Sequence, residues 1–162
     1  MKIVKGNLWN SNDNLILVST NSTLKKNGEL VMGRGAAKEA RDLKVGLPRM
    51  FGYQIQEQCG SGGRYGIILA RRFTSSPDNN MEIAEINGKY YGAFQVKYHW
   101  KDKADLELIY FSTQVLDKLM RVHFNLKCSM NFPGIGNGQL TYDEVYPIIE
   151  QLPDNVTVYM KE

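Results

Sequence analysis

Short apolar runs of strand length alternate with segments of helical periodicity along this chain, and that alternation favours an α/β fold. The run Leu15-Ile16-Leu17-Val18 is continuously apolar, as in a central strand that is buried on both faces. Further strands are expected over residues 3–8, 65–70, 127–132 and 156–160, and helices are expected to begin near Gly35, Pro48, Asp102 and Thr141. We therefore predict a three-layer α/β/α architecture, in which a mixed sheet carries helices on both faces.

A hairpin is predicted within residues 82–98. Asn87-Gly88 lies there between two alternating segments, and this pair is the strongest short-range signal for a two-residue hairpin turn. The sheet should therefore contain at least one antiparallel pair. No internal repeat or linker divides the sequence, so residues 1–162 are expected to form one domain.

The charge pattern argues against a protein that binds nucleic acid through its backbone. Twenty basic residues stand against 17 acidic ones, which gives a net charge of +3 and a pI near 8.8. The basic residues are spread along the chain, with no cluster larger than pairs such as Lys25-Lys26 and Arg71-Arg72. Neutralising a nucleic-acid backbone demands a clustered basic stripe, so a simple electrostatic nucleic-acid binder is not expected.

Membrane, metal and disulfide chemistry are also not expected. No apolar run approaches the roughly 20 residues that cross a bilayer, so a cytoplasmic protein without a membrane segment is predicted. Cys59 and Cys128 have no C-x-x-C partner, which predicts free thiols and no metal site. A hydrophobic content of 43% is enough to build a core without disulfides or bound metals to stabilise it.

Two glycine-rich segments are the candidate site for a phosphate. Gly33-Arg34-Gly35-Ala36 opens the first helix, and Gly134-Ile135-Gly136-Asn137-Gly138 precedes the last one. Glycine lets backbone N–H groups approach an anion, and a helix N-terminus adds partial positive charge. Together the segments could form two walls of a cleft for a diphosphate, although each alone could equally be a tight turn. Neither matches a P-loop or a dinucleotide fingerprint.

Four segments resemble macro domains. They are Val4-Lys5-Gly6-Asn7-Leu8, Met32-Gly33-Arg34-Gly35-Ala36, Pro133 to Gly138, and Val156-Thr157-Val158-Tyr159. In order and spacing they are most similar to the branch of terminal ADP-ribose glycohydrolases, which remove ADP-ribose from acidic side chains. The hairpin around Asn87-Gly88 has no obvious counterpart in that branch and is a candidate insertion.

The resemblance implies a set of residues around ADP-ribose. Asn7 stands where the family has an acidic residue that accepts a hydrogen bond from adenine, and its neutral amide should accept that bond more weakly. The implied ligand-binding residues are Asn7, Leu8, Gly33, Arg34, Gly35, Ala36, Pro133, Gly134, Ile135, Gly136, Asn137, Gly138 and Tyr159.

Catalysis is the less complete part of the resemblance. Lys97 stands where the branch has a lysine that attacks the anomeric carbon of the distal ribose, although it could equally be a solvent-facing lysine of the hairpin. The family aspartate after the second glycine loop is missing, and Asp143 is the nearest carboxylate, which the helix dipole alone would explain. Asn21 follows a strand and could orient the distal ribose or form a turn.

Two functions remain open at this point. The first is an enzyme that removes ADP-ribose from a modified macromolecule or acts on ADP-ribose 1''-phosphate. The second is a reader that binds ADP-ribose without hydrolysing it. Either would work as a monomer without a cofactor, and would contact nucleic acid only where the nucleic acid carries the modification.

Overall fold

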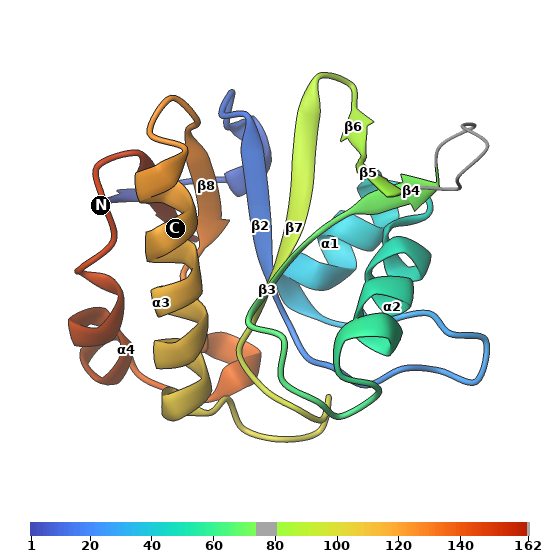
Figure 1. The fold of residues 1–162 in the computed structure, drawn as a ribbon. Coiled ribbons are helices and arrows are strands. Elements are labelled where there is room, and N and C mark those ends of the chain that lie inside the picture. The colour runs from blue at the N-terminus through green and yellow to red at the C-terminus, as the bar shows by residue number, and fades with distance from the viewer. Residues whose placement is uncertain (74–80, 162) are drawn as a thin grey trace.

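The computed structural model describes residues 1–73 and 81–161, and it shows a sheet between two pairs of helices (Figure 1). Helices α1 (Gly35–Leu43) and α2 (Leu47–Gln58) cover one face, and α3 (Leu106–Val122) and α4 (Tyr142–Ile149) cover the other. The predicted three-layer α/β/α architecture is confirmed.

Seven strands form the main sheet, in the order β1-β9-β8-β2-β7-β3 with β6 paired to β7. The first five strands of that order run parallel, whereas β3 and β6 are antiparallel to β7. The bounds are β1 Lys2–Lys5, β2 Leu15–Thr20, β3 Ile67–Leu69, β6 Glu85–Ile86, β7 Lys89–Gln95, β8 Cys128–Asn131 and β9 Val156–Met160. Strands β4 (Arg71–Phe73) and β5 (Met81–Ile83) form a separate ribbon, and short 3-10 helices lie at Leu8–Asn10 and Gly136–Gly138.

Strand β2 divides the core into two layers. Leu15 and Leu17 pack into the cluster beneath α3 and α4, whereas Ile16 and Val18 pack into the cluster beneath α1 and α2. Successive side chains of a strand point to opposite faces, so a continuous apolar run supplies both layers at once. The four side chains are 0–2% exposed, which confirms the central strand predicted from the sequence.

The predicted hairpin is present. Strands β6 and β7 pair around Asn87 and Gly88, whose φ angles of 52° and 80° are those of a two-residue primed turn. The second strand, β7, is nevertheless central, because it also pairs with β2 from Tyr90 to Gln95 and with β3. The carboxyl end of β7 therefore lies beside that of β2.

The start of α3 differs from the prediction. Asp105 is the cap of this helix, since its carboxylate accepts a hydrogen bond from the Leu108 N–H at 3.0 Å. Asp102 lies in the preceding turn, where its own N–H donates to the His99 carbonyl. The backbone bond from the Asp105 N–H to the Val96 carbonyl holds the helix start against the end of β7, a long-range contact that local sequence does not reveal.

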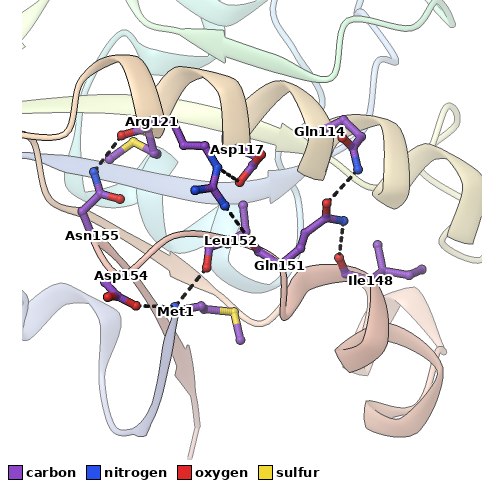
Figure 2. Close-up of polar contacts among 10 residues, drawn as sticks. Met1, Gln114, Asp117, Arg121, Ile148, Gln151, Leu152, Asp154 and Asn155 are labelled. Atoms are coloured by element: carbon purple, nitrogen blue, oxygen red, sulfur yellow. Dashed lines mark hydrogen bonds and ion pairs between the residues drawn. The ribbon is translucent and has the colours of Figure 1, made fainter.

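A polar network ties the chain between α4 and β9 to α3 and to the N-terminus (Figure 2). Gln151 accepts from Gln114 at 2.9 Å through its side chain and from Arg121 at 3.2 Å through its carbonyl. The amino group of Met1 donates to the Leu152 carbonyl at 3.0 Å. These contacts fix the β1–β9 edge of the sheet, although each exposed pair contributes little stability by itself. No helix in the described ranges is long and apolar enough to cross a membrane.

Helix α2 packs directly against the loop that follows β2, and this contact yields a stability prediction. A β-carbon on Gly52 would overlap the carbonyl oxygen of Gly28 and lie 3.1 Å from the Leu30 nitrogen. Alanine is the better helix former by about 1 kcal/mol, but the neighbour is backbone and cannot turn away. We expect Gly52→Ala to lower the free energy of unfolding by about 1–3 kcal/mol in urea titrations, as overpacking does.

The matched control is Gly6→Ala, because a β-carbon there meets nothing within 4 Å. Its unfolding free energy should stay within about 0.5 kcal/mol of that of the native protein. A Gly52→Ala variant as stable as the control would show that the loop moves away freely.

Candidate functional site

A cavity of about 310 Å³ lies at the carboxyl ends of β2, β7 and β8. Parallel strands bring these ends to one edge of the sheet, which is where α/β proteins bind ligands. Both glycine segments contribute to its walls. The lining residues are Ser19, Thr20, Asn21, Val31, Met32, Gly33, Arg34, Gly35, Ala36, Ala37, Val96, Lys97, Trp100, Asn131, Gly134, Ile135, Asn137 and Gly138.

The two glycine segments face one another across this cavity. The first turn of α1, Gly35 to Ala37, lines one wall, so the N-terminal N–H groups of the helix lie at the cavity. Gly35 also approaches the second segment, because a β-carbon there would lie 3.3 Å from the Asn137 Nδ2. The two segments therefore approach each other closely at this point, and the helix N-terminus gives the cavity wall a polarity that favours an anion.

The charged side chains in this wall are both cationic. They are Arg34, at the N-cap of α1, and Lys97, two residues beyond the end of β7. Half-burial lowers the pKa of the Lys97 ammonium, the charge of Arg34 lowers it further, and Asp102 opposes the shift. The Nζ atom donates to the Asp102 carbonyl at 3.2 Å. Lys97 is thus a partly desolvated amine that lines the cavity.

A second cavity of about 470 Å³ adjoins the first, since Ala36 and Asn131 line both. Asn7, Leu8 and Tyr159 line this second space, at the end of the β1–β9 edge. Predicted binding residues from the N-terminal and C-terminal segments of the chain therefore line the same cavity. The two cavities lie side by side along one cleft region, one with glycine-rich, cationic walls and the other lined by Trp9 and Tyr159.

Two asparagines at the cleft already have partners. The Asn7 side-chain oxygen accepts from the Trp9 N–H at 3.0 Å and caps the short helix that follows. Asn21 is buried, and its amide donates to the Val31 carbonyl at 3.0 Å and accepts from the Thr23 N–H at 2.8 Å. Asn21 therefore shapes the wall of the cavity by holding the loop that leads to Gly33.

Three predicted residues lie outside both cavities. Asp143 is exposed in the first turn of α4, next to the capping box of Thr141 and Glu144, and it does not reach the cleft. Pro133 and Gly136 belong to the second glycine segment but line neither space. Pro133 is buried and Gly136 is exposed, so the other residues of the segment form the cavity wall.

Two prominent wall residues were not predicted. Asn131 ends β8 and joins it to β2, because its amide oxygen accepts from the Ser19 N–H at 2.8 Å and its nitrogen donates to the Ser19 hydroxyl. Trp100 is 38% exposed at the mouth of the first cavity. A polar residue at a strand exit was the signal for Asn131, whereas nothing in the sequence around Trp100 distinguished it.

Comparison with solved structures decides the fold. The chain superposes on the macrodomain of Thermus aquaticus DarG with a TM-score of 0.71 and 20% identity, covering 99% of this chain and 97% of that chain. The TM-score to Thermosipho africanus DarTG in complex with ADP-ribose is 0.72 at 20% identity, over 99% of this chain and 41% of that chain. The macrodomain of Mycobacterium tuberculosis DarG gives 0.69 at 20% identity, over 98% and 95%.

The protein has the macrodomain fold. By sequence, no family model and no curated protein matches it. The macrodomain resemblance inferred from four short motifs is therefore supported by the three-dimensional structure. Within the described part of the chain, no group of three or more His, Cys, Asp or Glu side chains could hold a metal ion.

The charge of Arg34 gives a testable effect on Lys97. Because a neighbouring like charge disfavours the protonated amine, Arg34→Gln should raise the pKa of Lys97 toward its usual value. A pH titration of carbon-13-labelled lysine side chains by NMR measures this pKa directly, without any ligand. Arg49→Gln, at an exposed position of α2, should leave it unchanged. An unaltered Lys97 pKa in the Arg34 variant would mean that there is no significant electrostatic interaction between the two cations.

Proposed function

We propose that the cleft binds ADP-ribose. The observation that carries the proposal is the pairing of a cationic, glycine-walled cavity with an adjoining aromatic cavity, both lined by Ala36 and Asn131. ADP-ribose has the matching parts in the matching order, with a diphosphate and distal ribose at one end and adenosine at the other. One of the solved structures with this fold, DarTG, is described as a complex with ADP-ribose.

Each part of the ligand then has a place in the cleft. The diphosphate lies against the first turn of α1, with Gly134, Ile135, Asn137 and Gly138 on the opposite wall. The adenine lies between Asn7 and Tyr159. Because the Asn7 oxygen already accepts from the Trp9 N–H, it offers adenine only its remaining lone pair. Adenine should therefore contribute less than the diphosphate to the binding energy.

We further propose that the protein hydrolyses ADP-ribose from a modified target, or removes the phosphate of ADP-ribose 1''-phosphate. Lys97 supports this proposal, because a lowered pKa makes the neutral, nucleophilic amine more available at the ribose end of the cleft. Its nitrogen would attack the anomeric carbon, displace the target group and form a Schiff base with the opened ribose. Water would then hydrolyse the Schiff base and release ADP-ribose and the free amine.

A reader function is the second candidate, and one observation favours it. Among the described residues that line the first cavity there is no carboxylate, and Asp143 does not replace the family aspartate there. A lysine without an acid–base partner would turn over slowly. Binding without hydrolysis would need only the walls of the cleft.

A substitution at Ala36, where the two cavities adjoin, tests binding. Ala36 lines both spaces on the first turn of α1, so Ala36→Leu would fill the point through which the ligand passes. We expect calorimetry to show ADP-ribose binding to the native protein and at least about a 100-fold rise in Kd, or about 2.7 kcal/mol, for Ala36→Leu. Ala36→Ser keeps the small volume and should bind nearly normally. No heat with the native protein at millimolar ADP-ribose would refute the proposal.

Lys97 separates the enzyme from the reader. Lys97→Ala and Lys97→Arg should both abolish release of ADP-ribose from modified substrates, whereas Lys97→Arg should retain binding because it keeps the charge. Borohydride should trap a covalent adduct between ADP-ribose and the native protein only. Full activity in either variant would exclude the lysine mechanism, and binding without any turnover by the native protein would favour the reader.

A further inference from the structure

The cleft does not end at the proposed adenine cavity. A third cavity of about 230 Å³ shares Leu8 and Trp9 with the second cavity. Ala36, Glu39 and Leu43 line the three spaces in turn, and their spacing of three and four residues places them on one face of α1. The depressions therefore follow this helix for about 10 Å, from its first turn to its last.

The third cavity combines aromatic rings with cations. Tyr91 and Trp9 line it, and the Lys44 Nζ lies 5.3 Å from the centre of the Tyr91 ring. Lys89 lines it too, and its ammonium donates to the Ser11 carbonyl. An ammonium has three donors, so Lys89 keeps others for a ligand. Among the described residues in this wall, the charged ones are these two lysines, and no carboxylate offsets them.

Of the two rings, Tyr91 is buried and Trp9 is partly exposed. Cations beside an accessible aromatic ring are the elements with which proteins hold the phosphate and the base of a nucleotide. The position of the cavity adds a constraint. It lies beyond the adenine cavity, on the side away from Lys97, so a group reaching it would be attached at the adenosine end of ADP-ribose. The hydroxyl groups of the adenosine ribose are where a phosphodiester can be added without changing the adenine or the diphosphate.

We infer that the third cavity is a binding site for a nucleotide joined to the adenosine ribose of ADP-ribose. Lys44 and Lys89 hold its phosphate, and Trp9 provides a stacking surface for its base. The inference rests on the proposed binding of ADP-ribose and extends it: the ligand is an ADP-ribose unit that continues beyond its adenosine.

Calorimetry with two ligands tests the inference. The probes are ADP-ribose and a compound in which an adenosine ribose hydroxyl of ADP-ribose is joined to the 5'-phosphate of a second adenosine. We expect the extended compound to bind at least about fivefold more tightly, the scale of one or two partly exposed charge pairs. The difference should shrink as salt is raised, because the added contacts are ionic.

Lys44→Gln should remove most of the advantage of the extended compound while leaving the Kd for ADP-ribose unchanged. Lys89→Gln should act in the same direction, and its thermal unfolding reports whether loss of the Ser11 contact disturbs the fold. Lys25→Gln, an exposed lysine that lines none of the three cavities, is the control.

The outcomes distinguish a failure of the third site from a failure of the proposed ADP-ribose binding. If ADP-ribose binds and the extended compound binds no more tightly, the third site is refuted and the proposed function stands. If the advantage survives in both lysine variants, the assignment to this cavity is wrong. If neither compound binds the native protein, the proposed function fails and the inference fails with it.

Discussion

The parallel pairing of β2 with β7 on one side and β8 on the other determines the rest of the molecule. Backbone pairing runs from Leu15–Tyr90 to Thr20–Gln95 on one side and from Leu15–Cys128 to Leu17–Met130 on the other. Since the three strands run in one direction, their last residues emerge at one edge. The loops that follow must then lie side by side, and those loops form the walls of the main cavity.

Gln95, the last residue of β7, holds the backbone that leads to Lys97 in place. Its buried side chain accepts from the N–H groups of Tyr65 and Gly66 at 2.8 and 3.1 Å and donates to the Gly63 carbonyl at 2.9 Å. A buried amide with both ends satisfied holds its neighbours in one arrangement. The backbone two residues before Lys97 is thereby held in place, and the Lys97 side chain lines the cavity.

The sequence was informative where structure depends on local pattern. The apolar run of β2, the Asn87-Gly88 turn and the capping box at Thr141 each depend on a few neighbouring residues, and all three are found in the structure. It was less informative where a residue's role depends on distant partners. Asp105 caps α3 through a start fixed by Val96, and Asn131 is a wall residue because Ser19 lies opposite.

The same limit applies to the catalytic assignment. Lys97 follows a central strand, and the exits of central strands converge, so its position at the cavity follows from topology. Asp143 follows a glycine segment by only a few residues, yet the helix turn that it occupies points it to solvent. Distance along the chain was a poor guide there, since successive side chains of a helix differ in direction by about 100° and two residues are enough to point a side chain to the opposite face.

The contact between Gly52 and Gly28 limits how this cleft could be adapted to other ligands. Helix α2 meets the backbone of the loop there, so no side chain at this contact can be trimmed or enlarged to move the loop. A change in the shape of that wall would need compensating changes in α2 and in the loop at the same time. Single substitutions can instead alter the cleft at residues whose side chains face it, such as Arg34, Ala36 and Trp100. New ligand preferences in this scaffold should therefore arise from substitutions of the side chains that face the cleft, and not from movement of the loop.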